Sequence, residues 1–144
     1  MITSRYITDD DYSLLAGSLL LDDFHKDTPA SFFYAEGSVC SVYEDEHGPI
    51  CFVRGMPIIE NGVGIIQLDI QYINNQDGKR NLKAMLTGFP DLEQKAKENG
   101  FSGFFFISNV PLLRNFCIKR LGFQDYGDDF LGKLFIDKPK EDMI

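Results

Sequence analysis

A polar loop between an apolar strand and a helix carries residue types that bind phosphate. It runs from Asn74 to Asn81 and contains Gly78, Lys79 and Arg80. The first N–H groups of a helix have no acceptor within the helix, and the helix dipole makes that end positive. Such helix starts attract phosphate. Gly78 would let a ligand approach the backbone, so the sequence predicts a small-molecule phosphate site here.

Two simpler explanations of this loop remain open. Asp77-Gly78 is also a common turn, in which glycine is needed only for a positive φ angle. Lys79 and Arg80 could be solvated residues at the start of a helix. Because cations are otherwise unfavourable at the positive end of a helix dipole, their presence favours an anion nearby.

Asp69 is the carboxylate best placed for acid–base chemistry. Residues 63–73 alternate, with apolar side chains on one face and Gln67, Asp69 and Gln71 on the other, which predicts a strand. A carboxylate on the polar face of a central strand could accept a proton from a substrate. An ordinary surface carboxylate is the alternative interpretation.

Net charge limits the classes of partner. The formal net charge at pH 7 is −8, from 14 Lys and Arg against 22 Asp and Glu in 144 residues. An acidic surface argues against general binding of nucleic acid or of an anionic membrane. It favours a cationic partner such as an amine, although solubility alone also explains it.

The cysteines and histidines predict neither disulfides nor a metal site. Cys40, Cys51 and Cys117 are odd in number and lack CxxC spacing, which favours buried free thiols in a reducing compartment. His25 and His47 have no metal-ligand spacing with cysteines or carboxylates. Neither a signal-peptide core nor a membrane-spanning apolar run is found. We therefore expect a cytoplasmic protein without a metal.

The elements that must position these residues indicate an α+β fold. The length predicts one domain over residues 1–137 and a polar tail at residues 138–144. Apolar spacing predicts a helix over residues 82–96, with a kink or break at Gly88 and Pro90. The wholly apolar run Gly103–Ile107 predicts a buried central strand.

These elements predict a mixed, mostly antiparallel sheet flanked by helices, with a central strand–helix–strand unit. A hairpin is expected over residues 38–53, and a final hairpin turns at Gly127-Asp128-Asp129. Residues 63–73 and 104–107 should pair in parallel. If these two strands separate at their C-terminal ends, the gap between them would hold a cofactor.

The order and spacing of these pieces resemble the GNAT family, the Gcn5-related acyl-CoA N-acyltransferases. That family binds pyrophosphate with a loop of the form Arg/Gln-x-x-Gly-x-Gly/Ala, which matches Asn75-Gln76-Asp77-Gly78-Lys79-Arg80. Gly78 agrees with the pattern, whereas the first and last positions depart from it. The second signature of the family is an Asn after the fifth strand, followed by a helix that ends in Leu-Gly-Phe. It matches Ser108-Asn109-Val110-Pro111 and Leu121-Gly122-Phe123. The residue-level match extends from Ile65 to Phe123.

The resemblance implies a GNAT-like fold and an N-acetyltransferase that uses acetyl-CoA as acyl donor. Asp69 would be the base, and Asn109 would help to hold the cofactor arm, unless it only caps the following helix. The other residues implied in cofactor binding are the strand backbone at Ile70, Gln71, Tyr72 and Ile73, and the loop residues Gly78, Lys79, Arg80 and Asn81.

The resemblance also raises a question about catalysis. The usual general acid of the family is a tyrosine in the last helix, and Ile118 stands at that position. The acceptor would be a primary amine on a small molecule or protein, bound by residues 25–37, residues 58–62 and the last hairpin. We expect direct attack rather than an acyl-enzyme on Cys117. A GNAT-like protein that binds a protein partner and catalyses nothing is the alternative. The amine and the oligomeric state, including a homodimer, stay open.

Overall fold

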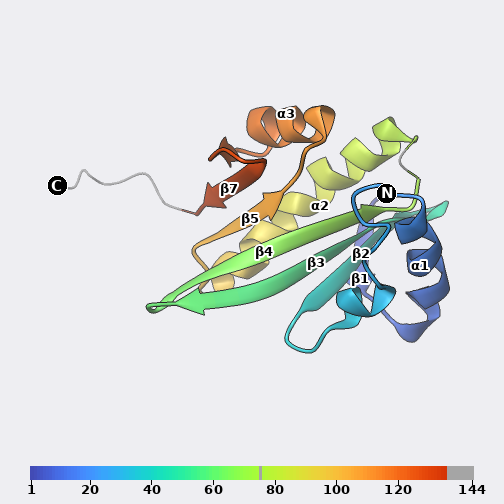
Figure 1. The fold of residues 1–144 in the computed structure, drawn as a ribbon, viewed down its shortest axis with the longest axis horizontal. Coiled ribbons are helices and arrows are strands. Elements are labelled where there is room, and N and C mark those ends of the chain that lie inside the picture. Colours follow the sequence, from blue (N-terminus) through green and yellow to red (C-terminus); the bar gives the residue numbers. More distant parts are fainter. Residues whose placement is uncertain (75, 136–144) are drawn as a thin grey trace.

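The computed structural model describes residues 1–74 and 76–135, which form one seven-stranded sheet with helices on both faces (Figure 1). Asn75 and the predicted tail at residues 138–144 lie outside the described residues. In chain order the elements are β1 (Thr3–Tyr6), the 3-10 helix η1 (Asp9–Asp11), α1 (Tyr12–Leu20), the 3-10 helix η2 (Ala30–Tyr34), β2 (Val39–Asp45), β3 (Gly48–Glu60), β4 (Val63–Tyr72), α2 (Gly78–Glu98), β5 (Gly103–Ile107), α3 (Pro111–Arg120), β6 (Gln124–Asp125) and β7 (Phe130–Leu134).

The sheet confirms the predicted mixed, mostly antiparallel architecture. Its strand order is β1-β2-β3-β4-β5-β7-β6. β4 and β5 pair in parallel, with α2 as the connection between them, and the other neighbouring strands pair antiparallel. The parallel pairing covers only three positions, from Ile65 opposite Gly103 to Gln67 opposite Phe105. Beyond them β4 continues along β3 alone, so the expected separation of the two strands is confirmed.

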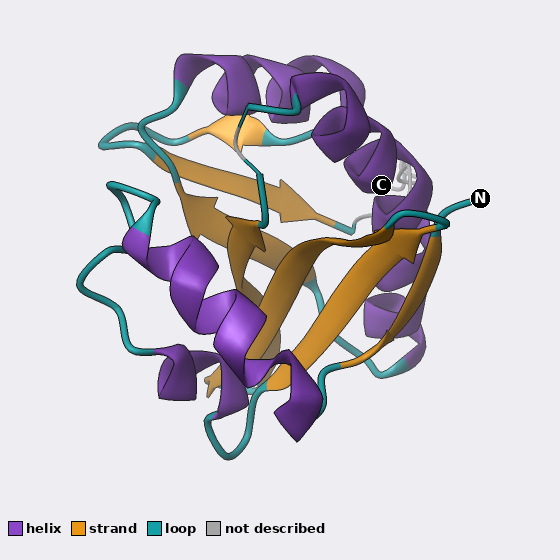
Figure 2. Ribbon diagram, turned by 90° about the vertical axis from the view of Figure 1, so that its right-hand side faces the viewer, coloured by secondary structure: helices purple, strands orange, loops and turns teal. Residues whose placement is uncertain are grey.

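Helices cover both faces of the sheet (Figure 2), and one apolar cluster lies on each face. The larger cluster lies under α2 and α3 and includes Met85, Phe89 and Phe104. The smaller cluster lies under α1 and η2 and includes Leu15, Phe33 and Phe52. Because successive residues of a strand point to opposite faces, β4 contributes Leu68 to the first cluster and directs Asp69 and Gln71 toward the second face.

Helix α2 corrects part of one prediction. It runs without a break from Gly78 to Glu98 although Pro90 lies inside it, so the predicted break is wrong and a kink at Pro90 stays a prediction. Buried residues on both sides of the proline, Met85 and Ala96, pack into the same cluster, and this packing outweighs the missing N–H. Gly88 has a separate reason, since a Cβ atom there would lie 2.6 Å from the ring of Tyr43.

Strand β5 also differs in part from its prediction. It is central, between β4 and β7, but it is fully buried on one face only. Phe104 and Phe106 are buried in the larger cluster, while Phe105 is half-buried on the other face and stacks on Phe130. Ile107 is 47% exposed. One face of β5 therefore packs into the core, and on the other face the ring of Phe130 covers Phe105.

No helix among residues 1–74 and 76–135 has the length and hydropathy needed to cross a membrane.

Candidate active site

A cavity of about 440 Å³ opens where β4 and β5 separate. Its walls are the second half of β4, the first turn of α2, the end of β5 with the start of α3, and Asp22, Phe24 and His25 after α1. The cavity therefore reaches both faces of β4. It brings together Asp69, Ile70, Tyr72, Gly78 and Asn81, which the sequence placed in one site.

The second half of β4 presents to this cavity an edge that pairs with no other strand among residues 1–74 and 76–135. The N–H of Ile73 donates to Ile50 O of β3 at 2.9 Å, and hydrogen-bonded pairs alternate along an antiparallel ladder. Gln71 and Ile73 therefore direct their backbone groups toward β3, whereas Ile70 and Tyr72 direct theirs toward the gap. Of the four residues whose backbone was predicted to bind the cofactor arm, Ile70 and Tyr72 direct their backbone groups into the gap, and Gln71 and Ile73 do not.

The start of α2 forms the far end of the cavity. The N-cap Asp77 accepts a hydrogen bond from the N–H of Arg80 at 3.2 Å. Asn81 is buried and donates from Nδ2 to Asn74 O at 2.9 Å, which fastens the loop to the helix. The N–H groups of Gly78 and Lys79 belong to the first turn and have no acceptor within the helix.

The geometry of Gly78 excludes the turn explanation. Its φ angle is not positive, and a Cβ atom built there would meet nothing within 4 Å. Neither strain nor crowding within the chain requires glycine at this position. The close approach of a ligand to the backbone at Gly78 stays a prediction, and the open space there is compatible with it.

The two predicted cations of the loop have different surroundings. Lys79 is exposed at the helix start. Arg80 turns to the β2–β3 hairpin, where it donates to both oxygens of Asp45, at 2.9 and 2.7 Å, and to Gly48 O at 3.0 Å. These hydrogen bonds hold the pKa of the Asp45 carboxyl below its usual range. Arg80 thus joins α2 to the hairpin, and a phosphate contact by it remains a prediction.

Asp69 is not a surface carboxylate, because only 16% of its side chain is exposed. It lies directly across from Arg54 of β3, whose Nη1 donates to Asp69 Oδ2 at 3.2 Å. Arg54 is fixed by donating from Nε to Phe32 O at 2.9 Å and by lying over the Phe32 ring. Burial raises the pKa of the Asp69 carboxyl, and the charge of Arg54 opposes that rise.

Two residues that line the cavity each carry a buried side-chain polar atom to which the sequence analysis gave no role. They are His25 Nε2 and Tyr72 Oη, which have no hydrogen-bond partner among residues 1–74 and 76–135. Burial raises the pKa of the Tyr72 hydroxyl. Periodicity placed Tyr72 on the apolar face of its strand, and no pattern marked His25, whose segment lacks a repeat. Native proteins seldom leave buried polar atoms unpaired, so both atoms call for a ligand or a water.

The start of α3 tests whether Asn109 caps that helix, which is one of the two roles considered for it. The N-cap of α3 is Val110, and no side chain caps this helix. The N–H of Val110 donates to Ser108 Oγ at 3.2 Å. Asn109 is exposed beside cavity residues Ser108 and Val110, so the capping explanation is wrong and cofactor contact stays a prediction.

The predicted acceptor segments contribute unequally. His25 lines the cavity, together with the preceding Asp22 and Phe24. Within the described part of the chain, residues 58–62 and the β6–β7 hairpin supply none of its lining. Ile118 of α3 is 36% exposed and is also absent from the wall. No group of three or more His, Cys, Asp or Glu among the described residues could hold a metal ion.

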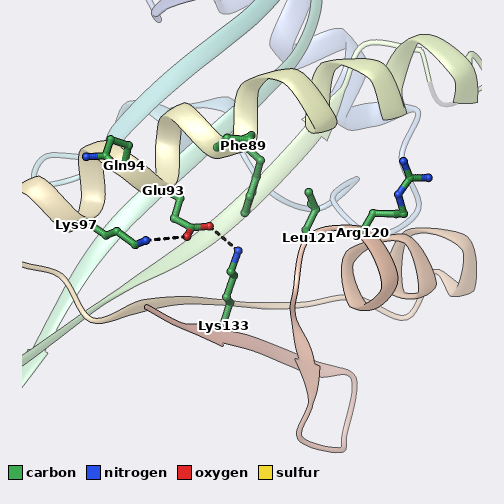
Figure 3. A pocket seen from close by; sticks show the side chains of 8 residues that line it. Phe89, Glu93, Gln94, Lys97, Arg120, Leu121 and Lys133 are labelled. Atoms are coloured by element: carbon green, nitrogen blue, oxygen red, sulfur yellow. Dashed lines mark hydrogen bonds and ion pairs between the residues drawn. The ribbon is translucent and has the colours of Figure 1, made fainter. Parts of the chain in front are cut away.

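A smaller hollow of about 180 Å³ lies between α2, α3 and β7 (Figure 3). Glu93 of α2 points between two lysines there and forms ion pairs with Lys97 and Lys133 (Figure 3). The carboxylate is thus already matched by cations from its own helix and from β7. This arrangement fastens the last hairpin to α2 and offers no unsatisfied group for chemistry.

Comparison with solved structures identifies the fold. A GNAT-family acetyltransferase from Staphylococcus aureus Mu50 superposes with a TM-score of 0.73 at 13% identity, covering 94% of this chain and 100% of that one. A GNAT-family acetyltransferase from Brucella melitensis in complex with acetyl-CoA gives 0.65 at 15% identity, over 94% and 89% of the two chains. An aminoglycoside acetyltransferase in complex with coenzyme A and kanamycin gives 0.67 at 15% identity, over 94% and 95%.

No family model and no curated protein matches the sequence. At these identities the structural similarity shows that the chain has the GNAT fold, as the sequence motifs predicted.

Proposed function

We propose that the protein is an N-acetyltransferase that transfers the acetyl group of acetyl-CoA to a primary amine by direct attack. The observation that carries this proposal is the gap between β4 and β5, which has an unpaired strand edge along one wall and a helix start at its end. Solved proteins of this fold include complexes with acetyl-CoA and with coenzyme A.

The α2 end of the gap supports the phosphate part of the proposal. Gly78 leaves room for a ligand at the first turn, where N–H donors and the helix dipole favour anions. Lys79 adds an exposed cation. The backbone groups of Ile70 and the N–H of Tyr72 are the donors and acceptors left for an extended arm, because the carbonyl of Tyr72 already accepts from Gln71 Nε2 at 2.9 Å.

The opposite end supports the amine part. Asp69 would attract the ammonium form of the acceptor and accept a proton from it, directly or through water. When the amine nitrogen bonds to the acetyl carbon, the carbon–sulfur bond breaks and the thiolate must take up a proton. The family position for a proton donor holds Ile118. The thiolate would therefore take up the second proton of the attacking nitrogen, directly or through water.

Ile118 also favours a second candidate function. A protein of this fold that lacks the usual acid could bind a protein partner without catalysis. Coenzyme A binding separates the two candidates most directly, since a module with no use for the cofactor has no reason to keep the open helix start at Gly78.

Titration calorimetry with coenzyme A tests the proposal, with Gly78→Val as the diagnostic variant. A Cβ atom at this position meets no atom of the described residues within 4 Å, and the valine side chain would occupy the approach to the first turn. We expect coenzyme A affinity to fall by about tenfold or more, which corresponds to about 1.4 kcal/mol or more.

Gly17→Val is the matched control. Gly17 lies in α1, away from the cavity, and a Cβ atom there also meets nothing within 4 Å. This variant should bind as the parent protein does. A parent protein that does not bind coenzyme A would overturn the proposal, and unchanged affinity in folded Gly78→Val would remove the α2 start from the site.

A further inference from the structure

An aromatic surface lies on the Asp69 face of the sheet, beside the part that α1 and η2 cover. The cluster under α1 and η2 takes its buried strand residues from β2 and β3. Beyond β4 the same face continues over β5 and β7, where Gln67 pairs with Phe105 and Ile107 pairs with Phe130. Because paired residues lie on the same side of a sheet, and so do residues two apart in one strand, Phe105 and Phe130 share the face of Asp69.

Three rings form this aromatic surface, those of Phe105, Tyr126 and Phe130. Phe105 and Phe130 are stacked, with 5.0 Å between centroids and 9° between planes. The ring of Tyr126 meets Phe130 edge-on at 6.2 Å. Gly132 makes room for it, because a Cβ atom there would lie 2.9 Å from the Tyr126 ring. Tyr126 is 55% exposed and the two phenylalanines are half-buried, so a ligand can reach the surface.

The aromatic surface adjoins the proposed active site at Ile107. This residue lines the cavity, is 47% exposed and pairs with Phe130. Asp69 lines the same cavity from β4. With a rise of about 3.3 Å per residue and about 4.8 Å between strands, the backbone positions of Asp69 and Phe105 are about 8 Å apart. A substrate whose nitrogen lies at Asp69 can therefore reach the rings with a group several bonds away.

Charge and area indicate which kind of group fits this surface. Lys133 is the only basic residue of β5 and β7, and it pairs with Glu93 of α2 on the other face. Neither strand therefore offers a cation to an anionic group here. At their present exposures the three rings and Ile107 provide well under the about 800 Å² that each partner buries in a stable protein interface. One aromatic ring, which buries about 150–250 Å² as a side chain, is a better match.

We propose that the acceptor is an arylalkylamine whose ring packs against the aromatic surface while its ammonium group lies at Asp69 in the cavity. This inference rests on the proposed function and names its substrate class. A ring that packs on other rings, offset or edge-on, gains energy beyond the burial of its area. An alkyl chain must separate the ring from the nitrogen, because the rings and Asp69 belong to different strands.

The test compares 4-phenylbutylamine with n-butylamine, which share an alkylammonium group and differ by the terminal ring. The readout is the ratio of their kcat/KM values at saturating acetyl-CoA, in which any effect common to both amines cancels. We expect the parent protein to favour 4-phenylbutylamine by about tenfold or more, which corresponds to about 1.4 kcal/mol or more.

Tyr126→Ala and Phe130→Leu are the diagnostic variants. The first removes a largely exposed ring and the second keeps an apolar side chain in the hairpin, so both should fold. Each should lower the ratio by about threefold or more. Leu134→Ala is the matched control, because Leu134 is 50% exposed on the same face of β7 but lies opposite Gly103, at the end away from the cavity. This control should keep the parent ratio.

Titration calorimetry gives a readout that does not depend on turnover. On protein saturated with coenzyme A, 4-phenylbutylamine should bind about tenfold more tightly than n-butylamine in the parent and in Leu134→Ala. The difference should shrink in Tyr126→Ala and in Phe130→Leu. Thermal melting shows whether each variant is folded, and analytical ultracentrifugation shows whether the aromatic surface holds a second copy of the chain instead.

The possible failures point to different conclusions. A parent protein that acetylates n-butylamine with a ratio near one would overturn the inference while the proposed function stands, and so would two folded variants that keep the parent ratio. A parent dimer that dissociates in Tyr126→Ala without a change of ratio would assign the surface to a second copy. A parent protein that binds no coenzyme A and acetylates none of n-butylamine, 4-phenylbutylamine and kanamycin would contradict the proposed function, and this inference with it.

Discussion

Asp69 differs from a surface carboxylate in being held by a buried arginine on the cavity side of β4. Asp69→Asn keeps the size of the side chain and an oxygen that can face Arg54, but it removes the basic group. We expect turnover to fall about 10²–10⁴-fold. Coenzyme A affinity should not change, because the residue lies on the opposite face of β4 from the α2 start.

Steady-state rates and calorimetry on the same preparations check this prediction. Asp91→Asn is the control, since Asp91 is exposed on α2 and pairs only within its helix with Lys95. Full turnover in a folded Asp69→Asn would exclude the carboxylate from the mechanism.

Cys117 tests whether the acetyl group ever resides on the protein. It is 1% exposed in the larger cluster, and burial raises the pKa of its thiol to about 12. A thiol with this pKa is almost entirely protonated at pH 7, and the thiolate is the nucleophilic form. We expect Cys117→Ala to keep most activity, with its loss confined to stability, and mass spectrometry of the parent with acetyl-CoA to show no acetyl adduct on Cys117. An adduct there, with an inactive variant, would reverse the mechanism.

Residues whose role follows from local pattern were predictable, and residues whose role depends on distant partners were not. Asp69 and Gly78 followed from strand alternation and from a loop before a helix. The pairing of His25 with Gln71 joins residues 46 positions apart, and nothing in the irregular segment around His25 indicates it. The positive φ considered for Gly78 is absent because the helix begins at that residue.

At the scale of elements, β5 allows a prediction about stability, because its neighbouring phenylalanines lie in different surroundings. Phe104 is 1% and Phe106 is 4% exposed in the core, whereas Phe105 is half-buried against Phe130. Replacing Phe104 or Phe106 by alanine should cost about 3–5 kcal/mol of unfolding free energy.

Phe105→Ala is the control within the same strand and should cost clearly less, because a half-buried ring leaves less apolar surface to lose. Urea unfolding of the three variants measures the difference. Equal losses in all three would mean that β5 is buried on both faces, as the apolar run alone indicated.

Element boundaries depended on partners that a local pattern does not contain. The helix pattern before and after Pro90 was visible, but its continuity depends on Met85 and Ala96 packing into one cluster. β3 extends to Glu60, well past the predicted end of the hairpin near Val53, because β4 pairs with it along its whole length. Tertiary packing therefore overrode local propensity in both cases.

At the scale of the whole molecule, the α+β fold class was predictable from the strand–helix–strand unit in the sequence. The parallel pair and its separation followed from apolar runs joined by a helix. The site at the gap is different, because it combines residues of the loop after α1, β4, α2, β5 and α3 across both faces of β4. Periodicity assigns a residue to a face of its own element, and it cannot show that Asp69 and Tyr72 border one cavity from opposite faces.

The acidic character of the molecule gives the last prediction. A net charge of −8, with Asp22 and Asp69 in the cavity, attracts a cationic amine and repels anionic coenzyme A at long range. Raising NaCl from about 0.1 M to about 1 M shortens the Debye length from about 10 Å to about 3 Å. We expect kcat/KM for n-butylamine to fall several-fold at saturating acetyl-CoA, while coenzyme A affinity holds or rises. Sucrose of equal osmolality is the control, because it adds no ions. A salt-independent kcat/KM would mean that the acceptor binds uncharged, and the carboxylates would then have no role in attracting it.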